Sequence, residues 1–227
     1  DPASHSGKAL INVLENYPRD DLFQLDADTL YAFAMDALSL IERPRVRVLI
    51  RAEQYDRFVS ILAYVPKDRY DTTVRLRIGG YLAEVFEGRL SAAYPAYPEG
   101  PLARTQFIIG RNRGKTPVVE RRVVEEAIEE IIQTWADRLK QTLAETEGEE
   151  EAGRLNRRYA EAFSAAYREA FTPQDSLNDI AVIERLDDEM PTAVHLYRKR
   201  GEHGGRASLK VFAHGQPIPL SRRVPML

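Results

Sequence analysis

The chain has 227 residues, of which 44% are hydrophobic, and its formal charge is −3. Its 32 basic residues are spread among 35 acidic ones, so DNA or RNA binding is not expected. The absence of cysteine excludes disulfides, thiolate metal sites and a cysteine nucleophile. No stretch has the pattern of a membrane span or a signal peptide, and together these features predict a soluble, cytoplasmic protein.

Two amphipathic helices are expected before residue 45. The first covers Ala9–Leu14 and is stopped by Pro18, and the second begins from a cap at Asp26 or Asp28 and ends before Pro44. Two helices of this length have little core of their own. They are therefore predicted to pack against another part of the chain.

The next region begins with two strands. Arg45–Arg51 alternates charged and β-branched residues, a pattern that predicts a strand with Val46, Val48 and Ile50 pointing inward. The apolar stretch Phe58–Asp71 completes the strand pair and leads into a helix. The rest of the chain can be placed relative to this stretch.

The following helix has Asp71 or Asp68 as its expected N-cap and Gly88 just past its end. Two more strand-like runs, Arg89–Tyr97 and Leu102–Gly110, come after it. The order is ββαββ, in which the helix covers one face of a mostly antiparallel sheet.

Glycine and proline mark two special positions in this unit. Gly79 and Gly80 fall in mid-helix, which indicates either close packing on the sheet or a site where a ligand or partner comes close. Pro95 and Pro98 remove ladder donors, so the strand that carries them is predicted to lie at a sheet edge.

A hairpin of long helices is predicted next. The first helix takes Thr116 as its cap and Pro117 as its first residue, and its apolar face continues to Leu143. The acidic run Glu145–Glu151 is interpreted as a solvated loop, and Leu155–Ala170 as the second, antiparallel helix.

The last part returns to strands. Thr172 caps a shorter helix, and Ala193–Arg198 and Ala207–Phe212 then flank the glycine-rich loop Gly201–Gly205. Ser221 is expected to cap a further helix. A β-hairpin followed by a helix repeats the start of the first ββαββ unit, so the sequence indicates the beginning of a second copy.

The stretch Gly110–Thr116 resembles a phosphate-binding P-loop but has three residues between its glycines, whereas a P-loop has four. Pro117 also removes an N–H from the expected helix start. The favoured interpretation is a basic linker. The alternative, a small nucleotide-dependent enzyme, would lose ATP binding on Lys115→Ala.

Other catalytic patterns are missing from the sequence. Neither a Gly-x-Ser-x-Gly elbow nor a Gly-x-Gly-x-x-Gly fingerprint is present. The acid pairs Asp20–Asp21 and Asp187–Asp188 are interpreted as caps or solvated surface. The four histidines, His5, His195, His203 and His214, have no metal-ligand spacing between them. His203, in its glycine-rich loop, could act in an assembled site. No active site is therefore predicted.

Basic residues near the expected strand ends could bind a carboxylate, because guanidinium groups do so with two hydrogen bonds. The alternative is that they are ordinary solvated charges. The candidate effector or interface residues are Arg47, Arg51, Lys67, Asp68 and Arg69.

Three motifs together resemble the N-terminal regulatory region of the bacterial large-subunit NAD-specific glutamate dehydrogenases. They are Tyr64–Tyr70, Trp135–Leu139, and Ser176–Ile180 with Glu184–Leu186. The resemblance covers about Leu10 to Leu227. It implies a whole enzyme that oxidises L-glutamate to 2-oxoglutarate with NAD, with its catalytic and NAD-binding domains further along the polypeptide.

The resemblance implies an α+β fold in four parts. These are an N-terminal helical lead-in (1–44), an ACT-like ββαββ domain (45–114), a helical hairpin with its connecting helix (115–188) and the truncated start of a second ACT-like unit (189–227). The motifs match structural residues, so no catalytic residue is assigned. The implied role is a non-catalytic regulatory and oligomerisation segment of the enzyme.

Cofactors and partners follow from the same resemblance. No cofactor or metal is expected in this segment, and NAD belongs to the whole enzyme. The expected partners are a second copy of the chain, the catalytic domains of the same polypeptide and an amino-acid effector. The alternative function is a stand-alone ACT-like amino-acid-binding sensor.

Overall fold

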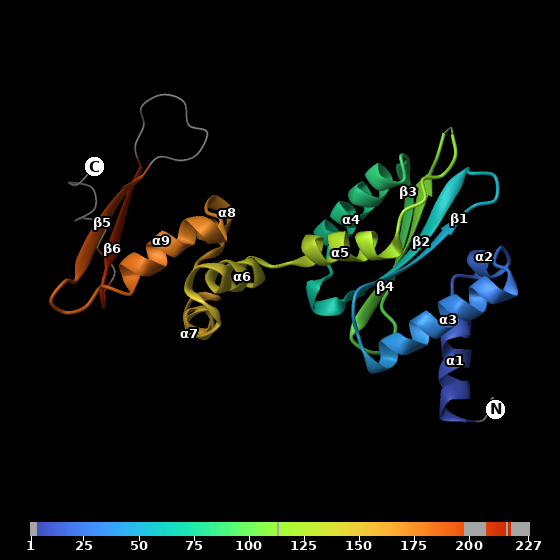
Figure 1. Cartoon of the computed structure of the whole chain (residues 1–227), viewed down its shortest axis with the longest axis horizontal. Helices are drawn as coiled ribbons and strands as arrows, with labels where there is room; N and C mark the ends of the chain where they lie inside the picture. Colours follow the sequence, from blue (N-terminus) through green and yellow to red (C-terminus); the bar gives the residue numbers. More distant parts are fainter. Residues whose placement is uncertain (1–3, 113, 198–207, 217, 219–227) are drawn as a thin grey trace. The chain divides into compact units, whose positions relative to one another are not determined.

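The computed structural model describes residues 4–112, 114–197, 208–216 and 218. The chain divides into two compact units, residues 1–133 and 134–227 (Figure 1). The first unit contains α1 (His5–Glu15), α2 (Arg19–Leu22), α3 (Ala27–Glu42), β1 (Arg47–Ala52), β2 (Phe58–Pro66), the 3₁₀ helix η1 (Lys67–Arg69), α4 (Thr72–Val85), β3 (Arg89–Ala96), β4 (Leu102–Gly110) and α5 (Arg121–Ile132). The second contains α6 (Trp135–Glu147), α7 (Glu149–Tyr159), α8 (Ala165–Ala170), α9 (Pro173–Ile183), β5 (Thr192–Tyr197) and β6 (Ser208–Ala213). The predicted α+β class is confirmed.

The first unit is built on an antiparallel sheet of order β1-β2-β4-β3. Strand β2 pairs with β1 on one side and with β4 on the other, and it is buried along almost its whole length. Strand β3 carries Pro95 and ends at Ala96, before Pro98, and it lies at an edge of the sheet, as predicted from the two prolines.

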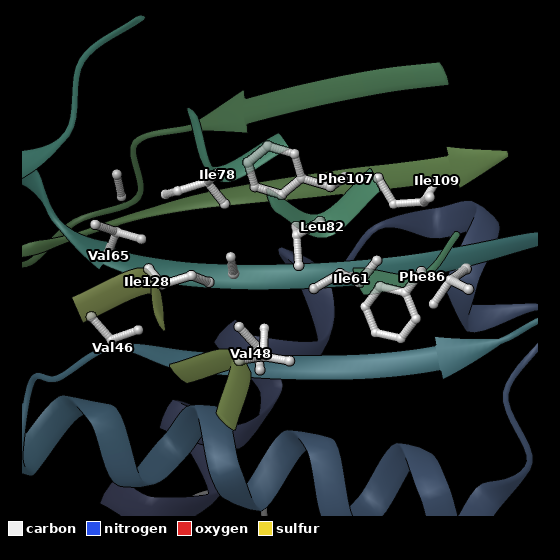
Figure 2. Close-up of a cluster of buried hydrophobic side chains, with 14 of the residues drawn as sticks. Val46, Val48, Ile61, Val65, Ile78, Leu82, Phe86, Phe107, Ile109 and Ile128 are labelled. Atoms are coloured by element: carbon white, nitrogen blue, oxygen red, sulfur yellow. The ribbon is translucent and has the colours of Figure 1, made fainter. Parts of the chain in front are cut away.

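Helices α4 and α5 cover one face of this sheet (Figures 1 and 2). The N-cap of α4 is Asp71, whose carboxylate accepts a hydrogen bond of 2.7 Å from the backbone N–H of Val74. The predicted inward residues of β1 contribute to this core. It is formed mainly by Val46, Val48, Ile61, Val65, Ile78, Leu82, Phe86, Phe107, Ile109 and Ile128.

Helices α1 and α3 pack on the opposite face of the sheet, so the predicted dependence of the first two helices on another part of the chain is confirmed. Tyr17, Ala37 and Leu40 meet the buried strand residues Leu49 and Leu62 there. The expected cap of α3 is correct: Asp26 accepts a hydrogen bond of 2.8 Å from the Thr29 N–H. Among the residues described, no helix combines the length and hydrophobicity that a membrane crossing requires.

The predicted long helix from Pro117 to Leu143 is wrong, because the structure has two helices there. Residues 116–120 are not helical, and the backbone N–H of Thr116 donates to Asp56, at 2.8 Å. The helix that follows, α5, ends at Ile132, and α6 starts afresh from a capping box between Thr134 and Asp137. This box is the sequence signal for the break.

In the second unit α6 and α7 pack against each other, so a helix pair is present but with other bounds than predicted. The acidic run is not a loop, because only Gly148, at φ 82°, separates the two helices. The predicted helix over Leu155–Ala170 is two helices, since α8 starts anew at a Ser164 cap. The expected cap of α9 at Thr172 is confirmed by a capping box.

The β-hairpin of the second unit is also present, formed by β5 and β6. The predicted loop Gly201–Gly205 and the helix expected after Ser221 lie outside the described residues.

The two mid-helix glycines of α4 differ in their surroundings. A Cβ on Gly79 would lie 2.6 Å from Leu90 Cδ2, so the close packing predicted for this pair explains Gly79. A Cβ on Gly80 would have no neighbouring atom within 4 Å. Packing therefore does not account for the second glycine.

We expect Gly80→Ala to stabilise the first unit by about 0.5–1 kcal/mol, because alanine restricts the unfolded chain and favours the helix. Gly79→Ala should stabilise the unit less than Gly80→Ala, or destabilise it, since the new methyl group must displace the Leu90 side chain. Urea unfolding of the two variants measures the difference. Equal midpoints for both would contradict the packing argument.

Candidate functional site

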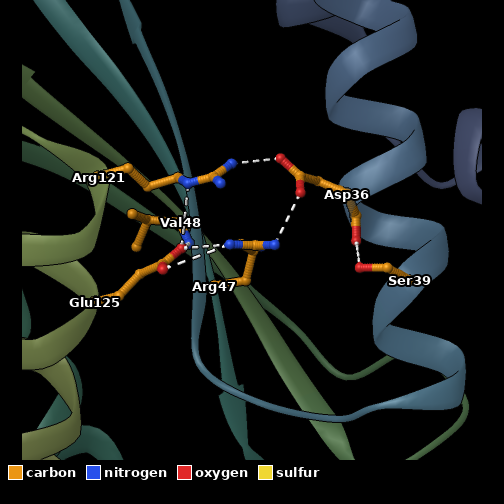
Figure 3. Close-up of polar contacts among 6 residues, drawn as sticks. All are labelled: Asp36, Ser39, Arg47, Val48, Arg121 and Glu125. Atoms are coloured by element: carbon orange, nitrogen blue, oxygen red, sulfur yellow. Dashed lines mark hydrogen bonds and ion pairs between the residues drawn. The ribbon is translucent and has the colours of Figure 1, made fainter.

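Arg47 connects helices on the two faces of the sheet (Figure 3). It lies at the start of edge strand β1, so its guanidinium can reach both Asp36 in α3, at 2.9 Å, and Glu125 in α5, at 3.3 Å. Arg121 pairs with the same two carboxylates. The Arg47 side chain is only 10% exposed, so its charge is compensated by these carboxylates inside the unit.

Arg51 pairs with Asp21 of α2, which is buried. The second carboxylate oxygen of Asp21 accepts hydrogen bonds from Ser60, at 2.8 Å, and Gln106, at 3.0 Å. The interpretation of Asp20–Asp21 as a cap or solvated surface is therefore wrong for Asp21. Ser60 and Gln106 are polar residues inside apolar strands, and such residues require a buried partner. They are the sequence signal that could have revealed the network.

Lys67, Asp68 and Arg69 form η1, at the end of β2. Lys67 donates from its side chain to the Pro98 carbonyl, at 2.6 Å, and from its backbone N–H to the Pro101 carbonyl, at 2.8 Å. Arg69 lies 3.4 Å from its neighbour Asp68. Lys67 thus holds the turn before β4.

The five candidate residues do not converge on one site. In the β1–β2 register Arg47 is opposite Tyr64 and Arg51 is opposite Ser60, so Lys67 lies toward the Arg47 end of the sheet. Arg47 and Arg51 belong to two separate ion-pair networks. Their role as effector or interface residues stays a prediction.

A cavity of about 250 Å³ lies where α1 and α3 meet the end of the sheet and the 98–101 turn. Its walls are mainly apolar, with contributions from Val13, Ala37 and Leu40. Arg104 of β4 lines this cavity and also a neighbouring one of about 300 Å³. Its guanidinium donates to the Asn16 carbonyl and also contacts Tyr64, whose pKa is raised by burial. Neither cavity was predicted from the sequence.

A further buried ion pair lies in the other unit. Lys210 of β6 is 2.5 Å from Asp179 of α9, and the Tyr167 hydroxyl donates to the same carboxylate. The Lys210 ammonium lies 3.6 Å from the centre of the Phe171 ring and 4.8 Å from that of Tyr197. Burial, followed by the hydrogen bond to Asp179, raises the pKa of Tyr167. This cluster, too, was missed from sequence.

The stretch Gly110–Thr116 does not have the geometry of a P-loop in its described part. The next helix begins five residues after Thr116, at Arg121. Arg111 is buried and donates to the carbonyls of Phe86 and Lys115, so it fastens the chain.

Metal ligation finds no support in the part of the chain that the structure describes, where no group of three or more acidic or histidine side chains could hold an ion. His195 Nδ1 is 3.9 Å from Asp179, and His214 Nδ1 is 3.5 Å from Asp188. His203 lies outside the described residues. Asp187 accepts from two backbone N–H groups, as expected of a turn residue.

The sheet, its ββαββ order and its helical covers define an α+β domain of the ACT type. Four models of glutamate dehydrogenase segments match the chain in order. They are helical motif 1 at residues 1–43, the ACT2 domain at 47–136, helical motif 2 at 142–186 and the ACT3 domain at 191–227.

Curated relatives agree with these matches. The chain is 38% identical over 226 residues to the NAD-specific glutamate dehydrogenase of Halomonas elongata and 31% identical over 227 residues to that of Pseudomonas aeruginosa. It is 34% identical over 236 residues to that of Mycobacterium tuberculosis. The alignments cover at least 99% of this chain and 14% of each relative. The chain therefore belongs to the NAD-specific glutamate dehydrogenase family, as a segment with regulatory ACT-type domains.

We expect Arg47→Met to destabilise the first unit by about 3 kcal/mol, because among the described residues it leaves Asp36 and Glu125 with only Arg121 as a cation. Urea unfolding measures the loss. Arg122→Met is the matched control on α5, since Arg122 is 81% exposed and its pair with Glu126 is worth less than about 1 kcal/mol. Equal losses of stability in both variants would contradict the role of Arg47 in joining the helices to the sheet.

In the second unit, Asp179→Asn should cost about 3–5 kcal/mol, because the Lys210 ammonium loses the buried carboxylate that pairs with it. The chain's single tryptophan, Trp135, lies in this unit and reports its unfolding by fluorescence. Adding Lys210→Met should recover part of the stability. An Asp179→Asn variant as stable as the exposed-pair control Glu151→Gln would contradict this role.

Proposed function

We propose that this segment is a non-catalytic regulatory and assembly part of an NAD-dependent glutamate dehydrogenase. The whole enzyme would convert L-glutamate and NAD to 2-oxoglutarate, ammonia and NADH. One observation supports this role: three of the charged candidate residues, Arg47, Arg51 and Lys67, form contacts that hold elements together inside the first unit. The matched family segments are helical motifs and ACT domains.

The β5–β6 hairpin supplies the surface that we propose for assembly. In its register Val194 is opposite Val211 and Leu196 is opposite Leu209, so these four side chains share one face. All four are exposed among the described residues, with Leu196 at 66%. A continuous apolar patch of this kind is typical of a surface that another protein element covers.

The partners in this proposal are a second copy of the chain and the catalytic domains of the same polypeptide. We retain the division at 1–44, 45–114, 115–188 and 189–227 as part of the proposal, together with a cytoplasmic location. The second candidate function is an amino-acid sensor, which the cavity beside Arg104 favours. In the regulatory role, the effector is an amino acid as well.

The 227-residue chain is expected to self-associate, and Val194→Asp with Leu196→Asp should shift it toward the monomer, because each carboxylate would lose its hydration in the contact. Sedimentation velocity over a concentration series measures the shift. Leu76→Asp is the control, since Leu76 is 59% exposed on α4, a helix of the first unit.

Two results would contradict the proposal. The first is a parent chain that sediments as a monomer at all concentrations. The second is found in the whole enzyme: a loss of kcat for glutamate oxidation in the double variant while the native oligomer is retained would give the hairpin a catalytic role.

A further inference from the structure

We propose that the cavity between α1, α3 and the end of the sheet binds a small carboxylate with a compact, branched apolar body, and that Arg104 holds the carboxylate. The cavity belongs entirely to the first unit. The regulatory meaning of such binding rests on the proposed function, but the binding itself does not.

The size and walls of the cavity restrict the ligand. Its volume of about 250 Å³ is below the roughly 300–1,000 Å³ of sites for drug-sized molecules, so a dinucleotide or ATP is too large. Apolar side chains from α1, α3 and β4 line it, among them Val13, Ile41 and Leu102. An aliphatic group of a few carbons therefore suits the interior.

Arg104 provides the charge for an anionic group. Arg51 is neutralised by Asp21, whereas the described contacts of Arg104 are to neutral acceptors, the Asn16 carbonyl and the Tyr64 side chain. A guanidinium has five N–H donors, so these contacts leave donors for a ligand. A carboxylate can accept two of them in parallel.

Two further side chains could contact the part of the ligand next to the carboxylate. Glu99 and Asn12 line the same cavity, and either could accept a hydrogen bond from an amino group on the ligand. The shared chemistry, a carboxylate on a branched body, is common to an amino acid, a 2-oxo acid and a simple fatty acid. An experiment can separate these three sources.

The test is isothermal titration of the 227-residue chain with L-leucine, 4-methyl-2-oxopentanoate and 4-methylpentanoate. These probes have the same isobutyl group and differ only beside the carboxylate. We expect at least one to bind, and the tightest of the three identifies the source. A site that engages the amino group prefers L-leucine. No heat and no thermal shift with any of the probes would overturn the proposal.

Two variants test the location. Arg104→Met should weaken binding at least about tenfold, since a charge-assisted hydrogen bond is lost. Ala37→Leu should abolish binding without changing any charge, because its isobutyl group occupies the cavity that Ala37 lines. If Arg104→Met fails to fold, the Ala37→Leu variant still tests whether the ligand binds in this cavity.

The matched control is Arg77→Met, since Arg77 is exposed on α4, which covers the other face of the sheet. It should bind like the parent. Binding that survives both Arg104→Met and Ala37→Leu would also overturn the proposal. The proposed function fails through a different measurement, the sedimentation of the hairpin variant, so the two failures are distinguishable.

Discussion

The first unit depends on one constraint, that strand β2 has to be buried on both faces. Val59, Ile61, Ala63 and Val65 face α4 and α5, while Leu62 and Tyr64 face α1 and α3. A sheet covered only on the ACT-domain side would leave the second set in water. The N-terminal helices are therefore part of the domain's core, although the family matches place them in a separate helical motif.

Buried ion pairs join helical motifs to ACT elements in both units. Asp21 and Asp36 in the N-terminal helices meet Arg51 and Arg47 of the first ACT strand. In the second unit Asp179, within helical motif 2, meets Lys210 of the ACT3 hairpin. Each time the helix carries the acid and the strand carries the base.

This repeated arrangement has a mechanical consequence. Moving a helical motif away from its strand would expose one apolar surface and separate a buried pair of charges, both of which cost free energy. Each motif and its hairpin should therefore respond to a signal together. The cavity beside Arg104 lies at such a boundary, where a small ligand would contact α1, α3 and the sheet at once.

Local signals in the sequence were sufficient for most of the fold. Alternation in Arg45–Arg51, the caps at Asp26, Asp71 and Thr172, and the prolines in and just after β3 are all local features of the sequence, so they can be read directly. The break between α5 and α6 was also encoded locally, in the Thr134–Asp137 capping box, but a continuous apolar stripe concealed it.

The candidate site could not be predicted in this way. Arg47 and Arg51 are identified by the sequence as charges near strand ends, and that pattern is the same for a solvated cation, a ligand-binding cation and one end of a buried pair. The choice is made by residues distant in sequence, Asp36, Glu125 and Asp21, which approach only when the helices pack on the sheet. The sequence by itself thus determined the elements and the family, because both depend on local pattern. The tertiary structure decided which charges are internal and where a cavity remains, because burial depends on contacts between distant segments.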